Sequence, residues 1–221
     1  MSRAKRFLMF IQTMNPFRWA LLLAFTALAA TAADARKTVL FFGDSLTFGY
    51  GLEDPSLAFP SLIAKKIEAE KLPYRVVNAG LSGETSAGGL RRIDWVLRQP
   101  IAVCVIELGA NDGLRGLSPS DTEKNLQAII DKVRAKEPGT KIVLAGMQLP
   151  TSLGPEFRDR FAALYPELAN KNHVALIPFL LEGVGGVTEL NQPDQIHPTA
   201  RGHERVAENV WTILRPLLTQ P

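Results

Sequence analysis

Cysteine is almost absent from this chain, whose 221 residues include a single one, Cys104. One cysteine excludes an intramolecular disulfide. Cys104 lies inside the apolar run 101–106, which is typical of a buried strand, so a small core residue is favoured over a nucleophile. Histidine is also scarce, with three residues, and no spacing of Asp and His matches a known zinc pattern. We therefore expect neither a metal nor a cofactor.

Acidic residues are missing from the start of the chain, where the first one is Asp34. Four basic residues, the last of them Arg18, precede an apolar run at 19–30. That run is shorter than the roughly 20 residues that a membrane helix needs. Small residues at alternate positions follow at 30–35, so the pattern predicts a secretory signal peptide over residues 1–32, cleaved between about 30 and 35. An uncleaved membrane anchor is the second interpretation.

Met14 would begin a tidier signal peptide than Met1, because the apolar run would then follow after a few residues. We therefore hypothesise that translation starts at Met14.

Removal of residues 1–32 takes away four basic residues and no acid, which leaves 21 Lys and Arg against 22 Asp and Glu, a net charge of −1. Residues 33–221 therefore give no reason to expect nucleic acid as a partner, and we expect a periplasmic or secreted protein without a membrane span in its mature form.

Short apolar runs alternate with longer amphipathic ones through residues 33–221, which are enough for one domain. The strands are predicted at Val39–Phe42, Arg75–Asn78, Ile101–Leu108, Lys141–Ala145 and Val174–Ile177. The helices are predicted at Leu57–Lys71, Ser86–Arg98, Ser120–Ala135, Glu156–Lys171 and Thr199–Leu217. Strands without clean polar alternation, separated by helices, indicate an α/β fold: a single three-layer domain with a five-stranded parallel, flavodoxin-like sheet and helices on both faces.

A serine follows the first predicted strand at the turn Gly43–Leu46. In a parallel sheet the residues after successive strands meet at one edge, so Ser45, Gly80 and Asn111 are expected to converge there. A nucleophilic serine needs a base and an acid that orients the base. Asp194 and His197, three residues apart near the C-terminus, supply both. His203 is a weaker candidate for the base, since no acid precedes it at the same spacing.

Four segments together resemble the blocks of one enzyme family, the SGNH or GDSL hydrolases. They are Gly43–Thr47, Asn78–Gly80, Gly109–Asp112 and Asp194–Pro198. The stretches 76–86 and 107–116 are similar to the branch that contains bacterial periplasmic thioesterase I/lysophospholipase L1 and secreted arylesterases. The resemblance covers essentially all of residues 33–221. It implies a serine hydrolase that cleaves carboxylic esters or thioesters, with aryl esters, acyl-thioesters or lysophospholipids as small-molecule or lipid-like substrates.

The same resemblance assigns roles to residues in the matching blocks. Ser45 would be the nucleophile, His197 the base and Asp194 the orienting acid. The backbone N–H groups of Ser45 and Gly80 and the side-chain amide of Asn111 would form the oxyanion hole. Asp44 and Asp112 are expected to be hydrogen-bond acceptors that stabilise the loops and not reacting groups. From their positions in loops after the strands, an apolar groove for the acyl chain is hypothesised at Leu114, Leu149, Leu153, Leu181 and Val184.

Two other functions remain open at this stage. The same blocks occur in esterases that remove acetyl groups from carbohydrates, which would narrow the substrate to short acyl esters. A non-catalytic, flavodoxin-like binding module is the alternative from a different class, because the turn Gly43–Gly49 at a helix start would bind an anion. That alternative gives Asp194 and His197 no role, whereas a hydrolase uses both.

Overall fold

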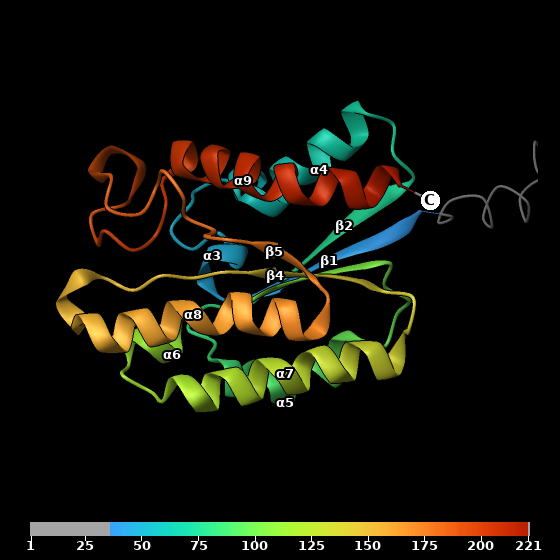
Figure 1. The fold of residues 1–221 in the computed structure, drawn as a ribbon. Helices are drawn as coiled ribbons and strands as arrows, with labels where there is room; N and C mark the ends of the chain where they lie inside the picture. Colours follow the sequence, from blue (N-terminus) through green and yellow to red (C-terminus); the bar gives the residue numbers. More distant parts are fainter. Residues whose placement is uncertain (1–35, 221) are drawn as a thin grey trace, which may run out of the picture. The chain divides into compact units, whose positions relative to one another are not determined.

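Five parallel strands form one sheet in the computed structural model, which describes residues 36–220 (Figure 1). The order across the sheet is β2-β1-β3-β4-β5, so β1 pairs with both β2 and β3. This order places the end of β1 next to two strand ends that carry motif residues. The strands are β1 Lys37–Gly43, β2 Tyr74–Gly80, β3 Val103–Glu107, β4 Lys141–Ala145 and β5 Ala175–Ile177.

Helices cover both faces of the sheet (Figure 1). On one face α4 packs against α9, and on the other α7 packs against both α5 and α8. The long helices are α4 Phe59–Ala69, α5 Ser86–Val96, α7 Pro119–Lys136, α8 Pro155–Asn172 and α9 Ala200–Thr219. The predicted three-layer α/β fold with a five-stranded parallel sheet is confirmed.

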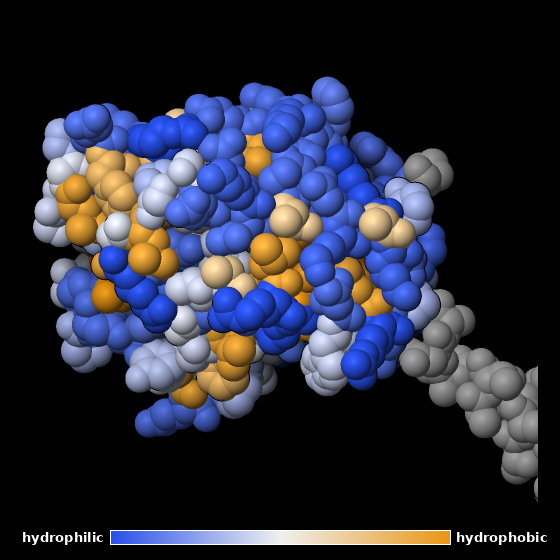
Figure 2. Space-filling view, turned by 90° about the horizontal axis from the view of Figure 1, so that it is seen from below, coloured by the Kyte–Doolittle hydropathy of each residue, from blue (hydrophilic) through white to orange (hydrophobic). Residues whose placement is uncertain are grey.

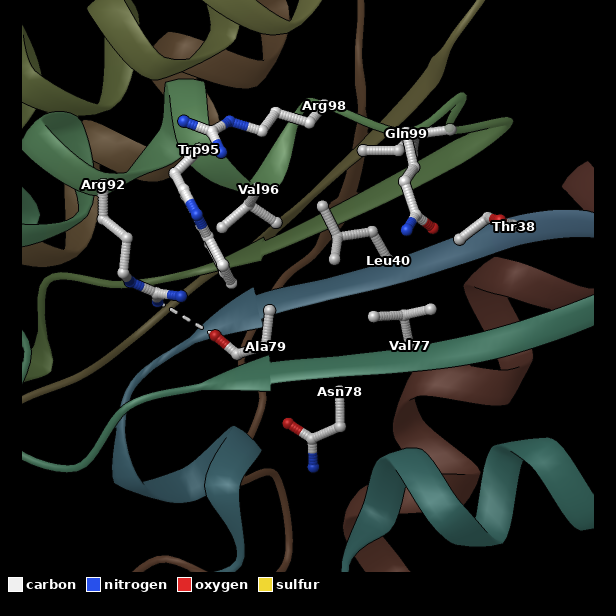
Figure 3. A pocket seen from close by; sticks show the side chains of 11 residues that line it. Thr38, Leu40, Val77, Asn78, Ala79, Arg92, Trp95, Val96, Arg98 and Gln99 are labelled. Atoms are coloured by element: carbon white, nitrogen blue, oxygen red, sulfur yellow. Dashed lines mark hydrogen bonds between the residues drawn. The ribbon is translucent and has the colours of Figure 1, made fainter.

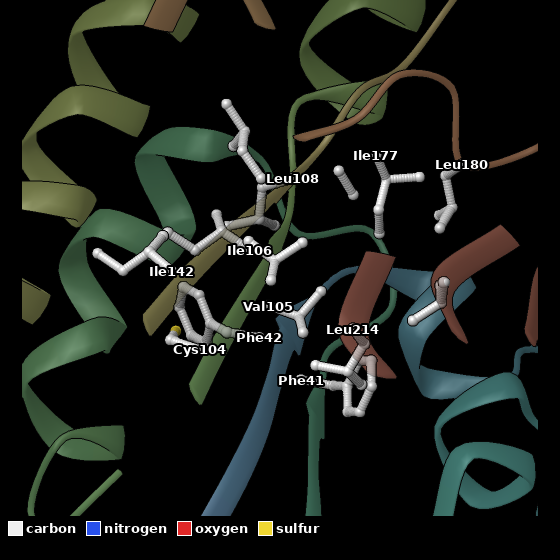
Figure 4. Packing of buried hydrophobic residues seen from close by; sticks show 14 of the residues in the cluster. Phe41, Phe42, Cys104, Val105, Ile106, Leu108, Ile142, Ile177, Leu180 and Leu214 are labelled. Carbon is white, nitrogen blue, oxygen red and sulfur yellow. The ribbon is translucent and has the colours of Figure 1, made fainter. Parts of the chain in front are cut away.

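The core is continuous through the sheet because the central strands are buried on both faces. Phe41 and Phe42 alternate in direction along β1, and both side chains are fully buried (Figure 4). Cys104 lies in the same core on β3, and burial raises the pKa of its thiol to about 12. The thiol is therefore neutral and inaccessible, which agrees with the expectation of a core residue.

Short helices are the main departure from the sequence prediction. The predicted helix at Leu57–Lys71 is divided into a 3₁₀ turn, η2 (Pro55–Leu57), and α4, because Ala58 between them has an extended backbone. Helices α3 (Ser45–Phe48) and α6 (Ala110–Leu114) follow β1 and β3 and were not predicted. Both are too short to show helical periodicity, yet both carry motif residues. Two further 3₁₀ turns are η3 Thr151–Leu153 and η4 Thr188–Leu190.

The outer surface is mostly polar where the helices face solvent. Figure 2 looks onto the side covered by α5 and α7 and shows hydrophilic residues interrupted by apolar patches. Among residues 36–220 no helix is long and apolar enough to cross a membrane. The predicted signal peptide, its cleavage position and the choice between Met1 and Met14 all lie outside the described residues.

Candidate active site

Ser45 stands at the first position of α3, directly beyond the carboxyl end of β1. Asp44 is the N-cap of this helix, and its Oδ1 accepts a hydrogen bond of 3.0 Å from the Leu46 N–H. The cap therefore comes from the aspartate, which leaves the Ser45 hydroxyl available for another partner. Ser45 retains 9% of its surface exposed, so the hydroxyl lies at the border between the core and solvent.

The side chains of Ser45, His197 and Asp194 form a hydrogen-bonded chain. His197 Nε2 lies 2.9 Å from Ser45 Oγ, and His197 Nδ1 lies 2.7 Å from Asp194 Oδ2. The loop before α9 folds back to make this possible: Asp194 Oδ1 accepts the backbone N–H groups of Ile196 and His197, each at 3.0 Å. The three residues that the sequence analysis selected are thus brought into contact.

Electrostatics keep Asp194 in the charged form. Burial by itself would raise the pKa of this carboxyl, but the hydrogen bonds from the His197 backbone, the His197 ring and Ile196 outweigh it and lower the pKa to about 2. Asp194 is therefore a carboxylate at neutral pH. An ionised acid at Nδ1 holds the imidazole so that Nε2 points at the serine with a free lone pair.

Asn111 approaches the same site from α6, one residue after its first position. Its Nδ2 donates to Asp44 Oδ2 at 3.0 Å and to the backbone oxygen of Glu84 at 3.1 Å. The amide thereby connects the loops after β1, β2 and β3. The Glu84 side chain pairs with Arg92, which also donates to the Ala79 oxygen, so the loop after β2 is fixed from two sides.

Gly80 does not fit the role that the sequence analysis gave it. Its N–H already donates to Asn78 Oδ1 at 2.9 Å, and Asn78 Nδ2 in turn donates to the Thr47 oxygen. A Cβ at position 80 would lie 2.2 Å from the Phe48 nitrogen, so glycine is required for β2 to approach α3. This glycine therefore serves the packing of β2 against α3.

Gly83 lies in the turn that Asn111 touches through the Glu84 oxygen. It has a φ of +76°, a conformation that favours glycine, and it is exposed. Within residues 36–220 the N–H groups of Ser45 and Gly83 have no hydrogen-bond acceptor in the protein. The sequence carried a usable clue here, since Ser82-Gly83-Glu84 has the composition of a turn.

Two buried carboxyls behind the serine include one that the sequence analysis missed. Glu107, the last residue of β3, is fully buried, and its Oε2 accepts from the Thr47 hydroxyl at 2.7 Å and from the Asp44 N–H at 3.2 Å. Burial and the neighbouring Asp44 raise the pKa of Glu107 well above its ordinary value. Burial also raises the pKa of Asp44 to about 6, despite hydrogen bonds from Leu46 and Asn111. Two adjacent buried carboxyls favour a shared proton over two charges.

Asp112 is buried between α5 and α7, and its hydrogen bonds go to residues of these two helices. Its Oδ2 accepts the Ser86 N–H at 2.8 Å and its Oδ1 accepts the Ser86 hydroxyl at 2.5 Å. Thr122 Oγ1 also donates to Oδ1, at 3.4 Å. Asp112 therefore ties α6 to the first turn of α5, which is the role of a loop-stabilising acceptor.

The five residues proposed for an acyl groove do not form one surface. Val184 has no exposed surface and Leu149 has 7%, so both belong to the core, and the expectation that they line an open groove is wrong. They lie in loops, but these loops close the end of the core. Leu153 and Leu181 are half-buried against it, and Leu114 is 37% exposed. Other large apolar side chains beside the motif residues are more exposed, namely Phe48, Tyr50, Leu81 and Ile196.

His203 has a structural position. Its Nδ1 accepts the Phe59 N–H at 3.2 Å and its ring stacks on that of Phe59, so the residue ties α9 to the start of α4. Burial, with a smaller contribution from His197, lowers the pKa of His203 to about 4. Among residues 36–220 no group of three or more His, Cys, Asp and Glu side chains is arranged to hold a metal ion.

Two hollows lie on the α5 side of the sheet, and neither is lined by Ser45 or His197. One, of about 400 Å³, lies along β1 and β2 beside α5 (Figure 3), where Arg92 reaches the Ala79 oxygen. The other, of about 490 Å³, lies over the turn 81–85 next to Gly83, with three arginines around it. These arginines are Arg91, Arg92 and Arg115. The Ser45 side chain lies beside exposed residues, among them Phe48, Tyr50 and Ile196.

Comparison with known proteins decides the family. The model of the GDSL-like lipase/acylhydrolase family matches residues 41–205, which include all of the motif segments. The chain belongs to this family. It is an SGNH hydrolase, as the resemblance of the four blocks implied.

The relatives that this chain matches belong to the branch that stretches 76–86 and 107–116 resemble. The chain is 45% identical over 189 residues to the esterase TesA of Pseudomonas aeruginosa, an alignment that covers 85% of this chain and 92% of TesA. It is 38% identical to thioesterase 1/protease 1/lysophospholipase L1 of Escherichia coli, covering 92% of this chain and 96% of that protein. It is also 35% identical to an arylesterase of Vibrio mimicus, covering 86% and 93%.

Solved structures of this family are similar throughout the domain. The crystal structure of TesA has 45% identity and a TM-score of 0.79, covering 82% of this chain and all of that one. The psychrotrophic esterase EstA from Pseudoalteromonas sp., in a structure inhibited by monoethylphosphonate, has 30% identity and a TM-score of 0.77, covering 83% and all of that chain. The fold of this chain is thus the fold of these solved esterases.

Proposed function

We propose that this SGNH hydrolase cleaves carboxylic esters and thioesters through a covalent acyl-enzyme on Ser45. His197 Nε2 takes the proton of Ser45 Oγ while the oxygen attacks the carbonyl carbon. The tetrahedral intermediate then collapses, and the leaving alcohol or thiol takes that proton from His197. Water, activated by His197 in the same way, releases the acid and restores Ser45. Asp194 stabilises the imidazolium in both halves of the reaction.

The oxyanion of the intermediate would be held by two backbone N–H groups and one amide. We propose Ser45 N–H and Gly83 N–H, in place of Gly80, together with Asn111 Nδ2. The absence of a protein acceptor for the two N–H groups in the described residues supports this choice. Asn111 would shift part of a hydrogen bond from the Glu84 oxygen to the oxyanion. Each such donor typically lowers the barrier by about 3–4 kcal/mol.

The hydrogen-bonded chain from Ser45 through His197 to Asp194 carries the proposal. An anion-binding module would not need it. The substrate class follows from the relatives, whose names describe an esterase, a thioesterase/lysophospholipase and an arylesterase. Exposed Phe48 and Ile196, beside the motif residues, supply apolar surface on which an acyl chain could lie.

Labelling with a fluorophosphonate, which phosphonylates an activated serine, tests the proposal. We expect the native protein to be labelled and Ser45→Ala to be unlabelled, with hydrolysis of an aryl ester reduced by several orders of magnitude. Ser61→Ala, which changes an exposed hydroxyl on α4 bonded to the Pro55 oxygen, is the matched control and should label normally. A native protein that is not labelled would favour the binding module.

Rates on nitrophenyl esters of increasing acyl length separate the two esterase functions. We expect hydrolysis to continue as the acyl chain is lengthened beyond acetyl, because the apolar surface beside Ser45 is open. Activity confined to acetyl groups on a sugar would instead identify a carbohydrate acetyl-esterase.

Because the predicted segment 1–32 has the pattern of an export signal, we also propose that the hydrolase acts in the periplasm or outside the cell.

A further inference from the structure

The two segments that meet at the catalytic pair come from opposite ends of the chain. Ser45 follows β1, whereas His197 lies 152 residues later in the loop before α9. Internal bonds hold each segment in shape. The Tyr50 N–H donates to the Ser45 oxygen at 3.0 Å, and the Gln192 N–H donates to the His197 oxygen at 2.7 Å. Neither bond fixes the distance between the two segments.

Gln192 crosses from one segment to the other. Its Nε2 donates to the Tyr50 oxygen at 2.7 Å and to the Pro198 oxygen at 3.0 Å. The bond to Tyr50 reaches the turn that ends α3, and the bond to Pro198 reaches the residue after His197. One side-chain amide therefore joins the residue after the base to the turn after the nucleophile.

The fit of Gln192 is close on the side of the nucleophile. Gly51 follows Tyr50 with a φ of +76°, and a Cβ there would lie 2.1 Å from Gln192 Oε1. The turn after α3 therefore needs glycine both for its backbone conformation and for the amide of Gln192. The Tyr50 ring adds a second contact, because its centroid lies 4.7 Å from that of the His197 ring at an angle of 45°.

We propose that Gln192 and the ring of Tyr50 are positioning residues that set the distance between His197 Nε2 and Ser45 Oγ. The inference rests on the proposed function, because that distance matters for proton transfer from serine to histidine. Both residues act through others: Gln192 holds the two segments together, and the Tyr50 ring packs against the imidazole. A misplacement of about 1 Å in such a pair is enough to cost up to about 100-fold in rate.

The Asp194–His197 bond does not depend on the contact between the two segments, since both residues belong to one loop. In Gln192→Met the donated bonds to Tyr50 and Pro198 are lost, while the backbone bond from residue 192 to the His197 oxygen remains. The loop should therefore keep its shape and its own Asp194–His197 bond. The substitution should therefore weaken the contact between the segment of Ser45 and the segment of His197.

The experiment compares Gln192→Met with Gln99→Met, the same change at an exposed glutamine beside Arg75. For Gln192→Met we expect kcat and the rate of fluorophosphonate labelling to fall about 10- to 100-fold, with KM within about twofold of the native value. The downfield proton signal of His197 Nδ1–H in the NMR spectrum should stay as in the native protein. Gln99→Met should match the native protein in every measurement.

Native kcat in Gln192→Met would overturn the proposal, and so would loss of the His197 Nδ1–H signal, because Gln192 would then only hold its own loop. Tyr50→Phe should retain kcat, since it keeps the ring, whereas Tyr50→Leu should lower it. Equal rates for these two variants would remove the ring from the proposal. If the native protein itself is not labelled, the proposed function fails, and the NMR signal still reports on the loop.

Discussion

Single ionisable residues in this protein differ sharply in what their surroundings do to them. Asp194 has its pKa lowered to about 2, since hydrogen bonds outweigh burial, whereas burial raises the pKa of Asp44 to about 6. Both are aspartates within the same group of loops. The difference comes mainly from burial, because Asp44 is 1% exposed whereas Asp194 lies at the surface, where its hydrogen bonds outweigh the smaller loss of water. Asp194 is thereby suited to stabilise a charged imidazole, and Asp44 to form hydrogen bonds in the interior.

His203 provides a test of stability against pH at this scale. Because its pKa is lowered to about 4 in the folded protein from an ordinary value of 6.5, the unfolded chain binds a proton first as the pH falls. Stability is therefore lost between pH 6.5 and pH 4, by about 3 kcal/mol from this residue. Denaturant unfolding at pH 7.5 and pH 4.5 should show a smaller loss in His203→Gln than in the native protein.

The comparison isolates His203, because both proteins share the buried Asp44 and Glu107. Those two carboxyls have raised pKa values and contribute in the opposite direction, favouring the fold as the pH falls, but they do so equally in both. Equal losses of stability in the two proteins would show that His203 is not held neutral.

Short elements, and not the long helices, carry the site. Helix α3 has four residues and α6 has five, too few to be stable alone. They are held by contacts to the strand ends: Glu107 accepts from Thr47 on α3, and Asn111 on α6 donates to Asp44. The strand end at Gly80 lies so close to Phe48 that a side chain would not fit. The position of Ser45 therefore depends on the packing of β2 against α3.

Gly80→Ala should move α3 and with it Ser45. Its Cβ would lie 2.2 Å from the nitrogen and 2.7 Å from the Cα of Phe48, and backbone atoms cannot step aside as a flexible side chain can. We expect a loss of about 1–3 kcal/mol in the free energy of unfolding, together with slower fluorophosphonate labelling. Gly139→Ala is the control, because a Cβ there meets nothing within 4 Å. Equal stability of the two variants would contradict this account of the contact.

The whole molecule combines a predicted export segment with a domain that is compact by itself. From Lys37 onward the chain forms one compact unit, and its five strands and long helices surround a continuous core. The positive net charge of the full sequence, +3, comes from residues 1–32, which carry four basic residues and no acid. Without these residues the sequence has 21 Lys and Arg against 22 Asp and Glu, a net charge of −1.

Expression of the full chain in a bacterial host tests the prediction of export. We expect the processed protein to begin between about residues 31 and 36 and to be labelled by the fluorophosphonate as the chain beginning at residue 33 is. An unprocessed precursor should begin at Met14, and a precursor that begins at Met1 would contradict the hypothesis about the start. An exported protein from which this segment has not been cleaved would favour the membrane anchor.

The sequence by itself determined the α/β class, the parallel sheet and the selection of Ser45, His197 and Asp194. Those conclusions rest on local patterns: apolar runs with helical or strand periodicity, a serine that follows a strand end, and an Asp and a His three residues apart before the last helix. Tertiary structure alone decided what depends on approach between distant segments. The N–H of Gly80 donates to Asn78, and its Cα lies too close to Phe48 for a side chain. Val184 is buried in the core, and Glu107 lies buried beside Asp44. No local pattern reports such contacts, because burial and hydrogen-bond partners are set by residues far away in the chain.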